Sequence, residues 1–329
     1  MGCLFLDATT VQELLPIEEC MDVMATALSS LTEGVSHMPQ RTVMRPPALA
    51  GVLGLMPAYI GGTRPILGLK AICVFPTNKL HGKDAHQGVV LLFDPSTGEA
   101  QAVVEASAIT AIRTAAVSAL ATRLLARSDA AVLALVGAGT QARAHLETID
   151  RVRRLSRVLV ADMIPDRAWD FVHELQACHD FSMEVADSVE AAVREADIVV
   201  TATTSSDPVL LGRWIRPGTH VNAVGASTRG ERELDADMVA RSSFFVDSRE
   251  AVLDGSGDYL GAVHEGAIDG PNHIRAEIGE LLLDQKPGRT ATEEITVFEN
   301  LGLAIEDVAA AAYACDRARE AGRGVWVEL

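Results

Sequence analysis

Residues 132–142 combine a short apolar run with the spacing Gly-x-Gly-x-x-Ala, a pattern that suits the binding of a dinucleotide phosphate. Gly137 permits a tight turn, Gly139 lets the backbone approach a pyrophosphate, and the small Ala142 lets a helix pack closely on a strand. The N–H groups at the start of the helix, near Thr140, would hold the phosphates. Glycine turns also follow buried strands for structural reasons alone, so the motif needs support from its surroundings.

Asp162 supplies that support, because it ends a second apolar run, 158–161, twenty residues after Ala142. A carboxylate at this place accepts hydrogen bonds from the ribose 2′-hydroxyl of NAD and repels the 2′-phosphate of NADP. Arg167 follows closely and would favour some NADP binding, although an exposed helix charge is its simpler interpretation. We therefore predict NAD as the cofactor, with NADP as the alternative.

Two lone charges lie in apolar surroundings, Lys70 within 66–74 and Arg113 within 106–122. A buried ammonium is costly unless it is paired or used, and desolvation lowers a lysine pKa until it can donate a proton near neutrality. An inward arginine suits a carboxylate, which its planar fork binds in a bidentate manner. Equally, either side chain could extend its charged end into water. Arg41 and Arg45 are surface residues or bind an anionic substrate, and spacing leaves both open.

Short strands and helices alternate from residue 130 to 248. The predicted strands are 132–136, 157–161, 181–186, 197–202, 219–224 and 243–247, and the predicted helices are 140–153, 166–177, 188–195 and 233–240. Strands rich in Val, Ile and Ala with helical crossovers predict a doubly wound parallel sheet, which binds ligands at the carboxyl ends of its strands. The loops that follow the fourth and fifth strands, 201–205 and 225–228, therefore face the cofactor.

The flanking regions read as a second, mixed domain. Helices are expected at 10–33, 107–126 and 303–320, and strands at 51–60, 66–75, 88–94 and 100–105, with a hairpin turn at 94–98. We expect the last helix to return to the first domain. The predicted fold class is α/β, with a discontinuous α+β domain (1–125 with 303–329) and a dinucleotide-binding domain (126–302).

Composition excludes several classes of protein. The chain has 329 residues, a net charge of −17 and 48% hydrophobic residues, which argues against nucleic acid and anionic membranes as partners. We find no apolar run of membrane-span length and no leader peptide, and the five scattered cysteines suit a reduced cytoplasmic protein. The nine histidines lack metal-ligand spacing, so we predict no metal and structural roles for His86 and His220.

Several motifs in order resemble those of the ornithine cyclodeaminase and mu-crystallin family. They are Arg45-Pro-Pro, Gly68-Leu-Lys-Ala71, Phe75-Pro-Thr-Asn78, 92–98, 109–116, 136–142, Val224-Gly-Ala-Ser227, Glu233-Leu-Asp235, Gly257-Asp258, 297–302 and Ala304-Ile-Glu-Asp307. The resemblance covers nearly the whole chain. It implies a substrate-binding domain that forms a homodimer and a Rossmann domain that binds NAD(P).

The resemblance also implies roles for individual residues. Lys70 would act on the reacting nitrogen, Arg45 and Arg113 would bind the substrate carboxylate, and Ser227 and Thr228 would line the pocket. Taken together, the predicted cofactor-binding residues are Gly137, Ala138, Gly139, Thr140, Gln141, Asp162, Thr201, Ala202, Thr203, Val224, Gly225 and Thr114.

Ser227 departs from the cyclodeaminases, which carry an aspartate after the fifth strand. Serine can accept a hydrogen bond but cannot act as the base that their reaction needs. The leading hypothesis is therefore an NAD(P)H-dependent reductase of 2-imino acids, acting in reverse as an L-amino-acid dehydrogenase. The alternatives are a cyclodeaminase in which Asp258 or Glu105 replaces the aspartate, and a non-catalytic binding protein. Glu299 and Asn300 also depart from many relatives and could alter the substrate pocket.

Overall fold

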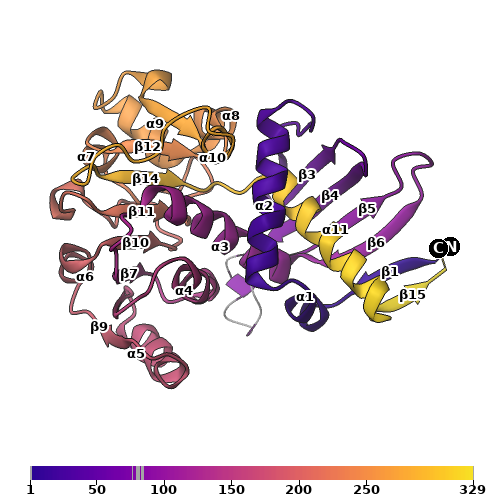
Figure 1. Cartoon of the computed structure of the whole chain (residues 1–329), viewed down its shortest axis with the longest axis horizontal. Coiled ribbons are helices and arrows are strands. Elements are labelled where there is room, and N and C mark those ends of the chain that lie inside the picture. The colour runs from indigo at the N-terminus through magenta and orange to yellow at the C-terminus, as the bar shows by residue number, and fades with distance from the viewer. Residues whose placement is uncertain (1, 76, 79–81, 83–84, 329) are drawn as a thin grey trace. The chain divides into compact units, whose positions relative to one another are not determined.

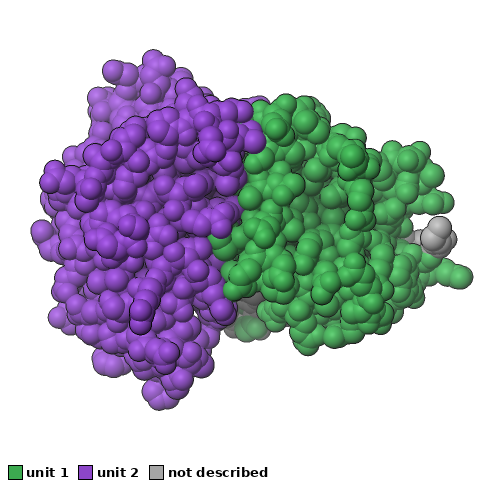
Figure 2. All heavy atoms as spheres, viewed as in Figure 1, with its two compact units in different colours: residues 1–116, 303–329 green, residues 117–302 purple. Residues whose placement is uncertain are grey.

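The computed structural model describes residues 2–75, 77–78, 82 and 85–328, and it divides into two compact units (Figure 2). Unit 1 comprises residues 1–116 and 303–329, and unit 2 comprises residues 117–302. This boundary lies inside helix α3 (Ala106–Leu125), whereas the predicted boundary lies at the end of that helix. Pro76 of the Phe75–Asn78 motif lies outside the described residues.

Unit 2 is built on an eight-stranded sheet in which every neighbouring pair is parallel. The order is β13 (Ile274–Glu277), β12 (Ser243–Val246), β14 (Thr296–Glu299), β11 (His220–Ala223), β10 (Ile198–Thr201), β7 (Val132–Val136), β8 (Arg157–Ala161) and β9 (Ser182–Val185). The predicted doubly wound sheet is confirmed. The predicted number of six strands is wrong, because the four-residue strands β13 and β14 were not recognised and β14 separates β11 from β12.

The helices of unit 2 follow the predicted pattern closely at the start of the unit. They are α4 (Thr140–Val152), α5 (Pro165–Leu175), α6 (Val189–Glu195), α7 (Ala236–Ala240), α8 (Arg249–Gly255), α9 (Gly257–His264) and α10 (Ile278–Leu282), with short 3-10 helices η2 (Gln176–Cys178), η3 (Gly212–Trp214) and η4 (Gly270–His273). The predicted helix 233–240 begins later than expected, because Asp235 caps α7 by accepting the Met238 N–H. Glu233 therefore lies in the loop before α7.

Unit 1 contains a seven-stranded sheet with helices across it. The order is β15 (Val325–Val327), β1 (Cys3–Leu6), β6 (Ala100–Glu105), β5 (His86–Phe93), β4 (Ile66–Val74), β3 (Val52–Ile60) and β2 (Thr42–Met44). Strands β2 to β6 form an antiparallel meander, and β1 joins β6 in parallel. Helices α1 (Ala8–Leu14), α2 (Ile17–Thr32) and α11 (Ala304–Ala321) follow the predicted helical regions, and α2 and α11 lie across the strands (Figure 1). Residues 303–329, which include α11, group with this unit.

Helix α3 corrects one expectation. By length and composition it is the one helix among the described residues that could cross a membrane, although no run of that length was expected. However, 72% of its most apolar stretch is buried inside the protein. Small side chains such as Ala115, Ala116 and Ala119 are completely buried, which is typical of a core helix surrounded by protein.

Gly68 controls how closely α11 approaches the sheet. A Cβ atom at Gly68 would lie 2.8 Å from Val308 Cγ2 and 3.0 Å from the Leu91 carbonyl oxygen. Real side chains do not tolerate such contacts, so only glycine lets α11 pack this closely on β4. Lys70 lies two residues further along the same face of β4, and therefore close to the first turn of α11.

We predict that Gly68→Val lowers the free energy of unfolding by about 1–3 kcal/mol, because two methyl groups would enter an already filled contact. Denaturant unfolding followed by circular dichroism measures the change. Gly255→Ala is the matched control, since nothing lies within 4 Å of a Cβ at that position. Equal stability of the two variants would show that α11 does not depend on the missing side chain at Gly68.

Candidate functional site

Lys70 is a buried ammonium with two internal partners. Its side chain is 3% exposed, and Nζ donates to Thr110 Oγ1 at 2.7 Å and to Asp307 Oδ1 at 3.0 Å. Thr110 can accept because its own hydroxyl donates to the Ala106 carbonyl oxygen. The alternative in which Lys70 reaches water is therefore wrong, and the ammonium is held within unit 1.

Arg113 is also buried, and it binds carboxylates of the chain itself. Its Nε donates to Asp307 Oδ1 at 2.9 Å and its Nη1 donates to Glu306 Oε2 at 2.8 Å. Both acidic side chains are completely buried. Lys70, Arg113, Glu306 and Asp307 thus form a cluster of two cations and two anions, which we call the α11 charge cluster.

Burial and charge act in opposite directions on Lys70. Desolvation lowers its pKa most, Asp307 raises it, and Arg113 and Arg41 lower it further, so that the net pKa is about 8. For Asp307, burial alone would raise the pKa, but Arg113 and Lys70 outweigh burial and hold the pKa below its ordinary value. The cluster therefore contains a carboxylate that stays ionised and an ammonium that can lose a proton near neutral pH.

The two arginines near the Pro-Pro segment differ in environment. Arg45 is exposed just after β2, whereas Arg41 is half-buried and close enough to influence the charge of Lys70. The predicted role of Arg45 in binding the substrate carboxylate stays a prediction. Thr114, predicted to contact the cofactor, is buried on α3 directly after Arg113 and so belongs to unit 1, unlike the other predicted cofactor residues.

The glycine-rich turn in unit 2 has the shape that a dinucleotide requires. Gly137 has a φ of 99°, and a Cβ there would lie 2.6 Å from the Ala202 carbonyl oxygen. Gly139 is the N-cap of α4 and brings no side chain to the helix end, so its surroundings are open. The carbonyl oxygen of the Gln141 side chain is buried without a hydrogen-bond partner among the described residues. The open start of α4 suits a phosphate, which accepts hydrogen bonds from backbone N–H groups, whereas the Gln141 oxygen needs a donor such as a hydroxyl group.

Asp162 is fixed at the end of β8 and connects to the same turn. Its Oδ2 accepts the Ala138 N–H at 2.9 Å and its Oδ1 accepts the Ile164 N–H at 2.8 Å. Each oxygen keeps acceptor capacity for a ribose hydroxyl. Arg167 is exposed in the first turn of α5. The arrangement fits a dinucleotide without a 2′-phosphate.

Glu233 joins the two loops that the sequence places beside the cofactor. Its carboxylate is completely buried and accepts from Thr201 Oγ1 at 2.7 Å, the Thr203 N–H at 2.6 Å and the Gly225 N–H at 2.7 Å. Burial raises the pKa of Glu233, and the bonds from Thr201, Thr203 and Gly225 oppose that effect. One carboxylate therefore holds the loops after β10 and β11 together. Ala202 and Val224, also predicted to contact the cofactor, continue the two strands through backbone hydrogen bonds to Val136 and Thr201.

Ser227 and Thr228 follow on the same loop and are held by Glu231. The Ser227 N–H donates to Glu231 Oε2 at 3.0 Å, and the Thr228 hydroxyl donates to the same oxygen at 3.1 Å. Both side chains are half-buried. Their predicted contact with the substrate stays a prediction, while Arg229 is exposed and pairs with Asp254.

Asp258 and Glu105, the two candidates to replace the missing aspartate, accept hydrogen bonds from backbone N–H groups. Asp258 is completely buried and accepts the N–H groups of Glu233 and Leu234 at 2.7 and 2.8 Å. Burial raises its pKa to about 7. Glu105 accepts the N–H groups of Ser107 and Ala108 at the start of α3. Both carboxylates are engaged in holding loops or helix ends.

Glu299 and Asn300, the two residues that differ from many relatives, are buried inside unit 2. Glu299 accepts a hydrogen bond from the Ser256 hydroxyl, and burial together with the nearby Asp258 raises its pKa well above the ordinary value. Asn300 donates to Ser118 Oγ at 3.1 Å. His220, expected to be structural, is buried on β11 beside Thr296, and burial lowers its pKa to about 3. Among the described residues, no group of His, Cys, Asp or Glu is arranged to hold a metal ion.

Three acidic residues of these buried hydrogen-bond networks had no predicted role. Glu306, Asp307 and Glu233 belong to motifs of the family resemblance, but the sequence assigned none of them a task of its own. A usable signal was present, because Glu306 and Asp307 are adjacent acids in a helix that is otherwise small and apolar through Ala312. That is the same pattern that singled out Arg113.

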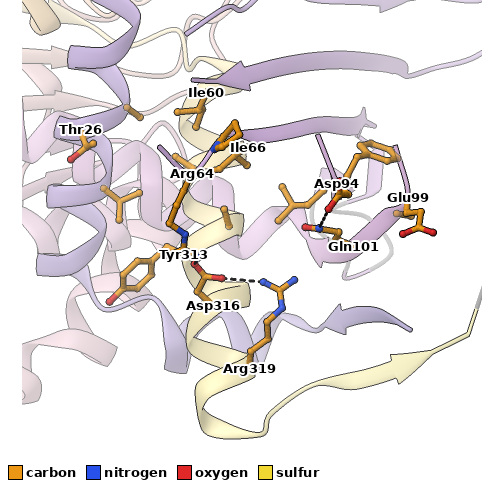
Figure 3. A pocket seen from close by; sticks show the side chains of 18 of the residues that line it. Thr26, Ile60, Arg64, Ile66, Asp94, Glu99, Gln101, Tyr313, Asp316 and Arg319 are labelled. Carbon is orange, nitrogen blue, oxygen red and sulfur yellow. Dashed lines mark hydrogen bonds and ion pairs between the residues drawn. The ribbon is translucent and has the colours of Figure 1, made fainter. Parts of the chain in front are cut away.

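Unit 1 also contains a cavity of about 810 Å³ between α2, the later turns of α11 and the strands (Figure 3). Its walls include Ile60, Ile66, Leu92 and Tyr313, and Asp316 pairs with Arg64 and Arg319 beside it. None of the residues of the α11 charge cluster lines this cavity. It is therefore separate from the predicted site residues.

Known proteins share this architecture over the whole chain. The family model of the ornithine cyclodeaminase/mu-crystallin family matches residues 2–322. The chain belongs to this family. The resemblance expected from the sequence motifs is thereby confirmed.

Individual known proteins are similar over nearly all of the chain. Mouse (Mus musculus) ketimine reductase mu-crystallin is 38% identical over 93% of this chain and 95% of its own length. The structure of Thermococcus litoralis Δ1-pyrroline-2-carboxylate reductase in complex with NADH and L-proline is 37% identical, with a TM-score of 0.95 over 98% of this chain and 99% of the other. An archaeal alanine dehydrogenase dimer with bound NAD is 33% identical, with a TM-score of 0.93 over the full length of both chains.

We predict that Asp162→Asn weakens NADH binding by about tenfold, or roughly 1.4 kcal/mol, and narrows the difference between NADH and NADPH. The asparagine removes the negative charge that repels a 2′-phosphate and leaves one oxygen for two backbone N–H groups. Fluorescence titration of each dinucleotide measures the dissociation constants. Asp166→Asn, an exposed acid nearby on α5, is the control. Unchanged discrimination in Asp162→Asn would place the 2′-position elsewhere.

Proposed function

We propose that this member of the family is an NAD(P)H-dependent reductase of 2-imino acids, cyclic or acyclic, that works in reverse as an L-amino-acid dehydrogenase. The observation that carries the proposal is the buried Lys70 ammonium, held by Thr110 and Asp307 beside Arg113. The related ketimine and pyrroline-2-carboxylate reductases act on the same type of bond.

The residues of unit 1 support the chemistry at nitrogen. Two of the three N–H bonds of Lys70 point to Thr110 and Asp307, which leaves the third for the substrate nitrogen. As the imine carbon gains a hydride, its nitrogen gains a proton, and Lys70 supplies that proton as a general acid. In our proposal Arg113 and Arg45 orient the substrate carboxylate, so that the imine carbon is held in one position.

The residues of unit 2 support cofactor binding. Gly137, Gly139 and Asp162 would hold the pyrophosphate and ribose of NADH, which supplies the hydride when bound. Glu233 fixes the loops at Thr201 and Gly225, where the carboxyl ends of the strands are expected to bind the nicotinamide end. NADP remains the alternative cofactor.

Cyclodeaminase activity is the second candidate, and the site argues against it. Ser227 carries no charge, and the carboxylates of Asp258 and Glu105 are engaged by backbone N–H groups. In our proposal these two carboxylates hold the backbone, and serine cannot act as the base that deprotonates a distal ammonium. A non-catalytic binding protein would not need a costly buried ammonium such as Lys70.

A homodimer is the second part of the proposal. Along β3 the even-numbered residues from Gly54 to Ile60 are buried, whereas Leu55 and Tyr59 on the other face are 36% and 39% exposed. Leu69 and Leu91, which pair across β4 and β5 on this face, are only half-buried. An apolar sheet face of this kind usually covers another protein surface. The similar archaeal alanine dehydrogenase is a dimer.

The net charge of −17 supports small molecules rather than nucleic acid as further partners. A cytoplasmic location stays a prediction.

We predict that the protein oxidises NADH with Δ1-pyrroline-2-carboxylate, Δ1-piperideine-2-carboxylate, or pyruvate with ammonia, and releases no ammonia from L-ornithine. Because Lys70 must be protonated, the rate of reduction should fall as the pH rises above about 8, and the reverse reaction should accelerate over the same range. Lys70→Met should lower kcat at least about 100-fold and remove this dependence.

Lys286→Met, which changes an exposed lysine in unit 2, is the control for Lys70→Met. Circular dichroism checks that both variants are folded. Ammonia release with proline formation would establish a cyclodeaminase instead. Binding of NADH without turnover of any imine would establish a binding protein.

We predict that Leu55→Glu converts a dimer into a monomer, because it places a charge on the apolar face of β3. Sedimentation velocity measures the change in mass. Trp169→Glu, which changes a side chain that is 62% exposed on α5, should leave the dimer intact. A dimer that survives Leu55→Glu would place the interface on another surface.

A further inference from the structure

Asp307 occupies the centre of the α11 charge cluster. A single oxygen, Oδ1, accepts from Lys70 Nζ at 3.0 Å and from Arg113 Nε at 2.9 Å. Three elements distant in sequence therefore meet at one atom: β4, α3 and the first turn of α11. The distance between the ammonium and the guanidinium is set by their shared acceptor.

This arrangement is costly for stability alone. All four side chains of the cluster are at most 5% exposed, so each charge has lost its water. Asp307 Oδ2 is also buried, without a hydrogen-bond partner among the described residues. Asp258 and Glu299 also have one buried oxygen of this kind, but Asp307 differs from them in accepting hydrogen bonds from two buried cations, Lys70 and Arg113.

We infer that Asp307 is a positioning residue for imine reduction, which holds the Lys70 ammonium charged and directed while it also fixes Arg113. This inference rests on the proposed function, because it explains how the proton donor of that reaction is kept ready. It assigns to α11 a role in the chemistry, although α11 follows Lys70 by more than two hundred residues.

The groups around Lys70 show why Asp307 has this effect. Arg113 on α3 and Arg41 before β2 are both cationic and disfavour the ammonium, and Thr110 on α3 is neutral. Burial acts in the same direction as the two arginines. Asp307 opposes all of these effects by direct contact, whereas Glu306 binds Arg113. Glu306 is thus a natural comparison, since it is adjacent, equally buried and acidic.

Nuclear magnetic resonance of the lysine side chains tests the inference without catalysis. Lysine occurs only at positions 70, 79, 83 and 286, so protein labelled with ¹³C at lysine Cε gives few signals, and Lys70→Met assigns one of them. In the wild type, the Lys70 signal should titrate near pH 8. In Asp307→Asn, the midpoint should fall by about one unit or more, because the stabilising charge is lost. In Glu306→Gln, it should move less than half as far.

Kinetics provide the second readout. The pH at which imine reduction declines should fall in Asp307→Asn together with the nuclear magnetic resonance midpoint. Glu306→Gln should keep that pH and instead raise KM, because it loosens Arg113. If Asp307→Asn does not fold, Asp307→Ser removes the same charge and leaves room for water, and it is expected to give the same shift.

Two results would overturn the inference. One is a Lys70 midpoint that stays at its wild-type value in the Asp307 variants, and the other is an equal shift in Glu306→Gln. Failure of the wild type to reduce any imine would instead overturn the proposed function. The titration of Lys70 would still be decided, since it does not depend on turnover.

Discussion

The contact of Lys70 and Arg113 with one oxygen of Asp307 is the interaction on which the buried charges of unit 1 depend. Two cations cannot remain buried close together without an anion between them, because each raises the cost of the other. Gly68 makes the contact possible by letting α11 lie directly on β4. Backbone geometry and charge are therefore linked in unit 1, since the helix that completes the core also brings the balancing carboxylates.

Unit 2 uses a buried carboxylate in a comparable way. Glu233 receives hydrogen bonds from two loops that are separate in sequence, and Asp258 in turn receives the N–H of Glu233 itself. The two loops approach each other so closely at Gly225 that no side chain fits there, because a Cβ atom would lie 2.1 Å from the Thr203 carbonyl oxygen. The loops that follow β10 and β11 are thus held together by buried hydrogen bonds.

Much of this organisation was accessible from the sequence where a pattern was long or chemically unusual. The strand 132–136 and the turn at Gly137 were recognised because periodicity and glycine spacing agree there. The three-residue strand β2 was missed because so few residues carry no period. Strand β14 was missed although other four-residue strands, such as β10 and β11, were predicted. The partner of Lys70 could not be predicted, since the acid lies on a helix that only the tertiary fold brings to β4.

The order of the elements along the chain has a consequence for biosynthesis. Unit 2 is continuous, whereas unit 1 needs α11, which is made after all of unit 2. Domains generally fold as they emerge during synthesis, so the nucleotide-binding unit can be complete while β4 still lacks its helix. Before α11 is made, Asp307 cannot pair with Lys70 and Arg113. Burying these two charges without that acid is unfavourable, so we expect this face of the sheet to stay in contact with water until then. The ion pair between Lys70 and Asp307 therefore forms only after the last helix of unit 1 has been made.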